Sequence, residues 1–152
     1  MLVEQQLYFA YGANMNIESM SRRCPGARPC GTWYLRDWRL RFYSHATIEQ
    51  APGHGVAGVL WQLTPECLDF LDCFEGYPDY YTRRTWQQDG VTVFFYEIQQ
   101  RQGHSHASYI QDIARSYGVW KLDTDLLHEA LEIRHEADVS VADHSGCTSL
   151  VC

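Results

Sequence analysis

Several of the signals that assign a chain to a large class of proteins are missing from this sequence. No apolar run approaches the ~20 residues that a membrane-spanning helix needs. The first ten residues, MLVEQQLYFA, lack the basic segment with which a signal peptide begins. We therefore expect a cytoplasmic protein that does not enter a membrane.

Positive charge is also scarce. The chain carries 12 lysines and arginines against 19 aspartates and glutamates, which gives a formal net charge of −7. Its arginines come in separate pairs, such as Arg22 with Arg23 and Arg83 with Arg84, and form no basic stripe. A surface that binds nucleic acid needs such a stripe or patch. We expect no nucleic-acid partner, while the sequence leaves the oligomeric state open.

Motifs for metal, phosphate and covalent catalysis are absent as well. Neither a CxxC pair nor a recognisable zinc motif occurs among the six cysteines and seven histidines, so we expect mostly reduced thiols and no metal. The sequence has no glycine-rich phosphate loop and no GxSxG nucleophile elbow. We therefore expect no cofactor. One alternative stays open, an amidase that uses Cys24 or Cys73 as its nucleophile.

The sequence does contain enough apolar material for one folded domain. Its 152 residues are 45% hydrophobic and 14% aromatic. A chain of this length buries roughly 70% of the surface that its unfolded form exposes. We expect one domain over residues 1–136. Residues 137–152 lose helical periodicity, and we expect them to form either a loose C-terminal tail or a late edge strand.

The first half of the chain predicts three strands and one helix. Residues 6–11 form a short apolar strand, and Asn16 is a suitable N-cap for a helix over Ile17–Arg23. Residues 31–44 alternate in the way of a strand with one polar face. The patch QAPGHG, at 50–55, predicts a turn before another apolar strand over residues 56–63.

The second half predicts a helix over residues 65–75, a hairpin and two late helices. Asp89 and Gly90 join two aromatic runs, which is a strong hairpin signal. Helical spacing then extends to residue 136 with a break at Gly118. Because strands and helices do not alternate regularly, we predict an α+β fold with a small mixed, barrel-like sheet and flanking helices.

The loop YGAN, at residues 11–14, is the first candidate for a site. Where a strand stops and a helix begins soon afterwards, backbone N–H groups lack internal partners and can bind an anion or a polarised carbonyl. Gly12 has no side chain to block an approach, and Asn14 can hydrogen-bond the loop or a ligand. The plain alternative is a tight turn that binds nothing.

Glu75 is the second candidate, and it lies in the last turn of a helix with well-marked ends. Thr64 suits the N-cap of this helix, and Gly76 ends it as a left-handed residue. Leu68 and Leu71 precede Glu75 at helical spacing, so the carboxylate shares the face that they turn to the core. Burial and the helix dipole both raise the pKa of such a carboxylate toward the range of a general acid/base. The plain alternative is an exposed or ion-paired glutamate at a frayed helix end.

Three stretches together resemble the gamma-glutamylcyclotransferase-like, or AIG2-like, family. They are YFAYGANM, the segment GVAGVLWQLTPECLDFLDCFEGYPDYYTRR and, more loosely, a late helix with Tyr109. The resemblance implies a mixed β-barrel with flanking helices. It also implies an enzyme that cyclises the γ-glutamyl group of a small γ-glutamyl amine or amino acid to 5-oxoproline and releases the amine, with Glu75 as general acid/base.

The resemblance also assigns residues to substrate binding. By position in the family's motifs these are Tyr11, Gly12, Ala13, Asn14 and Tyr81. Tyr80 could replace Tyr81, because the loop before them aligns in more than one way. Ala13 departs from the serine that is common in the family, which bears on substrate preference more than on the reaction.

Two matters stay open at this point. The same fold could be a non-catalytic small-molecule or protein-binding module. Within the enzyme reading, the amine that leaves could be an amino acid, a lysine side chain, a polyamine or another metabolite. The aromatic residues around the hairpin either pack together or line a pocket. They are Tyr77, Tyr80, Tyr81 and Trp86.

Overall fold

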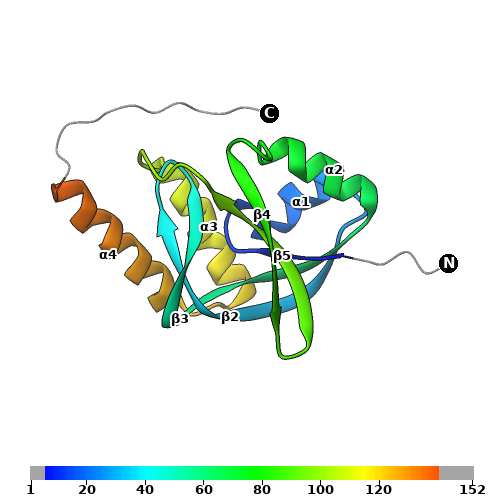
Figure 1. Cartoon of the computed structure of the whole chain (residues 1–152), viewed down its shortest axis with the longest axis horizontal. Coiled ribbons are helices and arrows are strands. Elements are labelled where there is room, and N and C mark those ends of the chain that lie inside the picture. Colours follow the sequence, from blue (N-terminus) through cyan, green and yellow to red (C-terminus); the bar gives the residue numbers. More distant parts are fainter. Residues whose placement is uncertain (1–5, 141–152) are drawn as a thin grey trace.

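The computed structural model describes residues 6–140 of the chain, and the side chains of residues 6–133. Five strands and four helices make up this part, with a short 3₁₀ turn after the first strand (Figure 1). In chain order the elements are β1 (Gln6–Ala10), η1 (Ala13–Met15), α1 (Ile17–Arg23), β2 (Arg28–Phe42), β3 (Ala46–Leu63), α2 (Pro65–Phe74), β4 (Tyr81–Gln88), β5 (Val91–Ile98), α3 (Ala107–Trp120) and α4 (Thr124–Ser140).

The strands form one mixed sheet in the order β2-β3-β1-β5-β4. The first strand is central: it pairs antiparallel with β3 and parallel with β5. Two antiparallel hairpins, β2 with β3 and β4 with β5, complete the sheet. The α+β class and the mixed sheet predicted from the sequence are confirmed.

The sheet is open, and a side chain joins its two edge strands at one end. The backbone N–H of Arg36 in β2 donates to Gln88 Oε1 in β4 at 2.8 Å, and Gln88 Nε2 donates to the carbonyl of Tyr34 at 2.9 Å. The amide of Gln88 thus takes the place of a peptide group between the edges. The expected barrel-like curvature is present without a closed backbone ladder.

The long β2–β3 hairpin contains the one clear error in the predicted strands. Residues 50–55 are not a turn but part of β3, and the chain reverses at Tyr43–His45 instead. The register shifts between Arg36 and Trp38, and Gly53 donates to the Asp37 carboxylate at 3.1 Å. The proline and glycines of QAPGHG therefore lie at a β-bulge, which tolerates residues that also favour turns.

The helix ends follow the sequence closely in α1 and α2. Asn16 caps α1 by accepting from the Ser19 N–H at 2.9 Å, and Thr64 caps α2 by accepting from the Cys67 N–H at 3.2 Å. At the other end of α2, Gly76 has a φ of 66° and forms a Schellman motif. These predicted ends are confirmed.

The break between the two late helices lies elsewhere than predicted. Gly118 is helical and belongs to the last turn of α3, whereas Lys121 has a φ of 56° and ends that helix. Helix α4 continues to Ser140, beyond the predicted end at residue 136. Residues 141–152, most of the predicted C-terminal tail, lie outside the described part of the chain, so the boundary after residue 136 stays a prediction.

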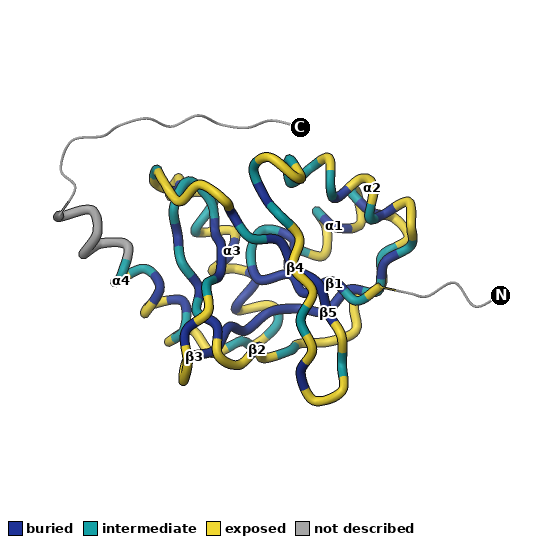
Figure 2. The backbone as a smooth tube through the Cα atoms, in the orientation of Figure 1, coloured by how far each residue is buried: buried dark blue, intermediate teal, exposed yellow. Residues whose placement is uncertain are grey.

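The core lies between the sheet and the helices, and its centre is aromatic. In Figure 2 the buried parts of β1 and β5 run through the middle of the molecule. Trp38 meets Phe95 and Trp86 edge to face, with ring centroids 4.9 and 5.2 Å apart. Of the two alternatives left open for the aromatic residues around the hairpin, Trp86 therefore follows the first, because it packs against Trp38.

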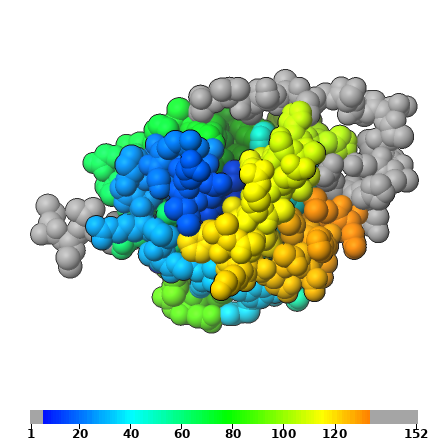
Figure 3. All heavy atoms as spheres, turned by 180° about the vertical axis from the view of Figure 1, so that it is seen from behind, coloured from blue at the N-terminus to red at the C-terminus, as the bar shows by residue number. Residues whose placement is uncertain are grey.

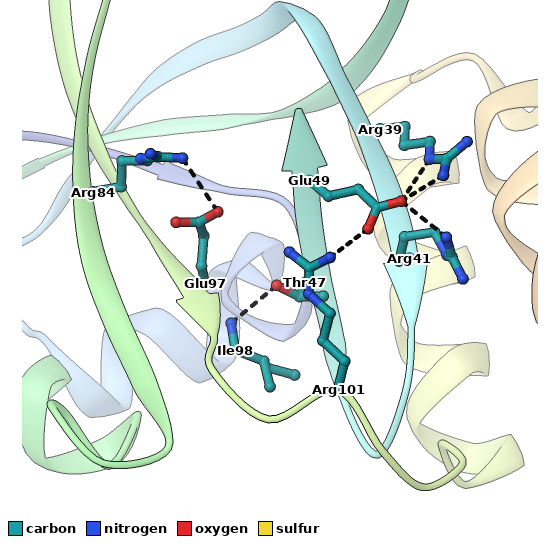
Figure 4. A network of polar contacts seen from close by, with 8 residues as sticks. All are labelled: Arg39, Arg41, Thr47, Glu49, Arg84, Glu97, Ile98 and Arg101. Atoms are coloured by element: carbon teal, nitrogen blue, oxygen red, sulfur yellow. Dashed lines mark hydrogen bonds and ion pairs between the residues drawn. The ribbon is translucent and has the colours of Figure 1, made fainter. Parts of the chain in front are cut away.

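A polar network fixes the loop after β5 to the β2–β3 hairpin (Figure 4). Arg39 and Arg41 of β2 reach one oxygen of Glu49 in β3 at 2.6 and 2.9 Å, and Arg101 of the loop reaches the other oxygen at 2.6 Å. The loop is held further where the Ser44 N–H donates to the carbonyl of Gln102 at 3.0 Å. This arrangement supports the wall of the pocket described next.

Two further observations apply only to the described residues. The helices there include none that is long and apolar enough to cross a membrane. The structure shows no disulfide at the cysteines there, which are Cys24, Cys30, Cys67 and Cys73, in agreement with the prediction of reduced thiols.

Candidate active site

A pocket of about 650 Å³ opens between the N-terminal segment, the end of α2, the start of β4 and α3. Figure 3 views the side on which the N-terminal segment with η1, in blue, meets α3, in yellow. Aromatic side chains dominate the lining, with a few charged groups among them. The lining residues are Tyr8, Tyr11, Gly12, Ala13, Asn14, Arg23, His45, Ala46, Phe74, Glu75, Gly76, Asp79, Tyr80, Tyr81, Tyr96, Gln100, Tyr109 and Asp112.

The loop after β1 forms one wall of the pocket. Strand β1 ends at Ala10, and the chain then turns through the 3₁₀ segment, in which Met15 and Asn16 donate the hydrogen bonds. The N–H groups of Ala13 and Asn14 precede these donors and lie at the open end of the turn. A Cβ on Gly12 would come within 3.5 Å of the Tyr109 hydroxyl, so glycine keeps this end of the pocket wide.

Glu75 reaches the same pocket from the opposite side, at the C-cap of α2. The Schellman motif turns the chain sharply after Glu75 and so fixes where its side chain leaves the helix. Burial raises the pKa of Glu75 to about 7, although the charge of Arg23 and a hydrogen bond from Asn14 oppose the shift. At neutral pH this carboxylate can therefore both accept and release a proton.

Asn14 joins the two walls. Its amide nitrogen donates to Glu75 Oε1 at 3.0 Å and is 3.1 Å from the Tyr8 hydroxyl. Its carbonyl oxygen accepts from Arg23 Nη1 at 2.5 Å. Asn14 is fully enclosed, so its amide has a defined orientation with respect to Glu75. The loop and the helix end that lie 61 residues apart in the chain are thus in direct contact.

Several tyrosines shape the pocket floor by binding backbone groups. The Tyr81 hydroxyl donates to the carbonyl of Ala46 at 2.6 Å, and the Tyr109 hydroxyl accepts from the Ala46 N–H at 3.0 Å. The Tyr11 hydroxyl donates to the carbonyl of Tyr96. Burial raises the pKa of the hydroxyls of Tyr11, Tyr81, Tyr96 and Tyr109, so these groups are neutral throughout the physiological range.

Tyr80 lies at the other side of the pocket, beside the tip of the β2–β3 hairpin. Its hydroxyl is 2.7 Å from His45 Nδ1 and is hydrogen-bonded to the Ser44 hydroxyl. Burial, with a smaller effect of His106, lowers the pKa of His45 and favours the neutral imidazole. Both Tyr80 and Tyr81 line the pocket. The question of which of the two faces it, left open by the sequence, therefore has the answer that both do.

The residues singled out from the sequence come together here. The structure places Glu75 and all of Tyr11, Gly12, Ala13, Asn14 and Tyr81 on the lining of one pocket. Tyr77, another aromatic residue of the hairpin region, lies outside this lining and packs under the Arg83 guanidinium at 4.4 Å.

Sequence reasoning missed Arg23 and the tyrosines at positions 8 and 96. In the sequence Arg23 stands out only as part of the basic pair with Arg22. Its place at the end of the helix that follows the YGAN loop is a signal that it could lie near this loop. Tyr8 and Tyr96 alternate with core residues in apolar strands. Nothing in the local sequence distinguishes such a tyrosine from one that only packs.

The cysteine alternative finds no support in this geometry. Cys24 and Cys73 are both absent from the pocket lining. Burial raises the pKa of the Cys24 thiol to about 12, so almost none of it is the thiolate that attacks a substrate.

Within residues 6–133, no group of three or more His, Cys, Asp or Glu side chains could hold a metal ion.

Comparison with known proteins identifies the family of the chain and agrees with the fold. The chain belongs to the gamma-glutamyl cyclotransferase, AIG2-like family, whose sequence model matches residues 8–121. A mouse and a human protein, each named gamma-glutamylcyclotransferase, are both 36% identical to it over 85 residues. This stretch makes up 48% of the chain and only 45% of each relative, so the match spans less than half the length of these proteins.

Solved structures extend the likeness of the fold to nearly the whole chain. A gamma-glutamyl cyclotransferase superposes with a TM-score of 0.70 at 24% identity, over 98% of this chain and 94% of its own. An uncharacterized human protein gives a TM-score of 0.71, also at 24% identity, over 99% and 95% of the two chains. The resemblance noted in the sequence is thereby confirmed at the level of family and fold.

Proposed function

We propose that the protein is a γ-glutamyl cyclotransferase, in which Glu75 is the general acid/base. The reaction converts the γ-glutamyl group of a small γ-glutamyl amine or amino acid to 5-oxoproline and releases the amine. The observation that carries the proposal is the position of Glu75, a carboxylate with a pKa raised to about 7 that contacts the YGAN loop inside a 650 Å³ pocket. The names of the relatives support the same reaction.

The chemistry requires little from the protein besides geometry and one proton carrier. The substrate contains its own nucleophile, the α-amino group, which closes a five-membered ring by attack on the δ-carbonyl. Holding these two groups about 3 to 3.5 Å apart makes the attack an oriented intramolecular step. No covalent enzyme intermediate is needed, which agrees with a pocket that contains no cysteine or serine among its lining residues.

Glu75 would act twice in one turnover. As the base it takes a proton from the α-ammonium, and the free amine then attacks the δ-carbonyl. As the acid it returns this proton to the departing amine when the bond between the δ-carbon and the amine nitrogen breaks. The attacking nitrogen loses its second proton to solvent as the ring amide forms, and the released amine can take up a proton from solvent in turn. A carboxylate with a pKa of about 7 suits both steps, because neither proton transfer is strongly uphill near neutral pH.

The YGAN loop would hold the glutamyl group. The N–H groups at the open end of η1 can donate to the substrate carboxylate or to the oxyanion that forms on the δ-carbonyl oxygen. Tyr11 and Tyr81 would bound the same space with neutral rings. Ala13 offers no hydroxyl, so the backbone groups of the loop make the contacts on that side.

The proposal is tested by incubating the protein with a panel of γ-glutamyl amines and γ-glutamyl amino acids. Mass spectrometry follows 5-oxoproline and the free amine, which should appear in equal amounts. Glu75→Gln serves as the matched control for contaminating activity. Treatment with iodoacetamide should leave the rate unchanged, whereas inactivation would favour a cysteine nucleophile.

The panel also tests the non-catalytic alternative. A binding module of the same fold would bind a γ-glutamyl compound, seen by calorimetry, without producing 5-oxoproline. If no member of the panel is bound or converted, both readings of the pocket are contradicted.

A further inference from the structure

Arg23 is a charged pocket residue to which the proposed reaction assigns no task. It lies at the last position of α1, and its side chain is half-buried. Its guanidinium stacks 4.0 Å over the ring of Phe74, the residue just before Glu75. Burial lowers the pKa of Arg23, yet an arginine stays protonated at any physiological pH. A positive charge is therefore held beside the base of the reaction.

Arg23 reaches Glu75 through Asn14. In the described part of the chain the two charged residues make no direct ion pair, but both are hydrogen-bonded to the Asn14 amide. A guanidinium has only donors, so the Asn14 oxygen must face Arg23. The Asn14 nitrogen must then face Glu75 and Tyr8, which is the orientation observed.

This orientation decides which oxygen of Glu75 is free. The Asn14 nitrogen donates to Oε1, and no hydrogen bond of the described residues engages Oε2. If the Asn14 amide were reversed, its oxygen would face the carboxylate and repel its ionised form. We propose that Arg23 positions Glu75 for proton transfer by fixing the Asn14 amide so that it donates to Oε1 and leaves Oε2 to the substrate. The proposal rests on the proposed function.

The other groups that face Glu75 cannot replace Arg23. Tyrosines approach it from β1, from the loop after β1, and from β4, β5 and α3; they are Tyr8, Tyr11, Tyr81, Tyr96 and Tyr109. Burial raises the pKa of all of them, so they are neutral and do not stabilise a carboxylate by charge. His45, Asp79 and Asp112 also line the pocket, and the two aspartates could only disfavour an ionised Glu75.

The test compares Arg23→Met with Arg22→Met and Arg23→Lys. Methionine keeps the apolar contact with Phe74 but has neither charge nor donor. Arg22 is the matched control, because it is the neighbouring residue on α1, its side chain is 72% exposed, and among residues 6–133 its ion pair is with Glu18 at 4.0 Å. Lysine keeps the charge and can still donate to the Asn14 oxygen, without the planar guanidinium.

We expect Arg23→Met to move the acidic limb of the kcat profile upward by about one pH unit. Below this limb kcat should fall about tenfold, and it should recover toward the wild-type value at alkaline pH, with little change in KM. Arg23→Lys should restore most of the profile, and Arg22→Met should coincide with the wild type. An unchanged acidic limb in Arg23→Met, or a loss of kcat that is equal at every pH, would overturn the proposal.

A second measurement does not depend on turnover. The Glu75 carboxyl is followed by carbon NMR in protein labelled at glutamate, with its signal assigned by its loss in Glu75→Gln. Its titration midpoint should rise when Arg23→Met is made in the wild-type protein. The rise should be clearly smaller when Arg23→Met is made in the Asn14→Ala variant. Equal shifts with and without Asn14 would rule out the relay through its amide. If the wild type forms no 5-oxoproline, the proposed function fails, while the titration still decides whether Arg23 acts on Glu75.

Discussion

Two enclosed glutamates of this protein lie in opposite surroundings. Glu49 accepts from the guanidinium groups of three arginines, and hydrogen bonds and charge from Arg39 and Arg41 outweigh its burial, so its pKa is lowered. Glu75 meets one amide donor and mainly neutral aromatic groups, so burial prevails and its pKa rises to about 7.

The difference separates a carboxylate that stays ionised from one whose pKa lies near neutral pH. Glu49 stays ionised and joins three segments of backbone through fixed ion pairs (Figure 4). Glu75 can exchange its proton near neutral pH, and it faces a pocket with room for a substrate. Two side chains of the same type thus differ in protonation because neighbouring donors and charge, and not burial alone, set the pKa of a carboxyl group.

The largest expected effect is on the reaction. We expect Glu75→Gln to lower the rate of 5-oxoproline formation by at least about 100-fold, because glutamine cannot accept the α-ammonium proton. The substitution keeps the volume and the oxygen to which Asn14 donates, so binding and fold should be retained. Initial rates with the best substrate of the panel measure the loss. A rate within a few-fold of the wild type would remove Glu75 from the mechanism.

The next effect is on stability. We expect Glu49→Gln to lower the free energy of unfolding by about 2 kcal/mol, because three guanidinium groups would then lie close together without an anion between them. Urea unfolding at neutral pH measures the change. The matched control is Glu18→Gln, an 82% exposed carboxylate with a single distant partner, which should change stability very little. An equal loss in both variants would contradict the role given to Glu49.

The pH dependence of stability should have opposite signs for the two glutamates. The raised pKa of Glu75 means that its favourable contribution is complete below the unfolded pKa of about 4.3 and is lost as the pH rises through about 7. The lowered pKa of Glu49 means that its contribution is present above the unfolded pKa and is lost as the pH falls through the lower folded value.

Relative to the wild type, Glu75→Gln should therefore gain about 3 kcal/mol of stability as the pH rises from about 4.5 to 7.5. The deficit of Glu49→Gln should instead shrink at acid pH. Urea unfolding of the three proteins across this range checks both slopes. Parallel curves for the two variants would show that the contrast between the carboxylates is wrong.

The smallest effect should come from one member of the arginine network. We expect Arg101→Gln to cost only about 0.5 kcal/mol, because its side chain is 40% exposed and Glu49 keeps its two other arginines. Urea unfolding at low and high salt measures the loss, which should decrease as salt screens the pair. A cost as large as that of Glu49→Gln would mean that the loop, and not the carboxylate, is the main element stabilised.

Local signals in the sequence were reliable where one or two residues decide the backbone. The caps at Asn16 and Thr64, the left-handed Gly76 and the turn at Asp89 and Gly90 were all predicted and are all present. Local signals failed where pairing decides instead. The QAPGHG segment resembles a turn, but its pairing with β2 makes it a bulge inside one long strand.

The candidate site could be predicted only in part for the same reason. Glu75 and the YGAN loop were found because each has a motif of its own. Arg23 has no such motif, and its place in the pocket comes from contacts with Asn14, nine residues before it, and with Phe74, which is distant in the sequence. Tyr8 and Tyr96 were missed because a buried tyrosine in a strand has the same pattern whether it faces a core or a cavity.

By itself the sequence determined the ends of α1 and α2, the β4–β5 turn and the family, because these depend on backbone preferences and on short motifs in a fixed order. Only the tertiary structure decided that Glu75 meets Asn14 and Arg23 in one pocket, and that Glu49 instead meets three arginines. The physical reason is that the pKa of a carboxylate depends on groups brought near it by folding, and the residues next to it in the chain do not specify them.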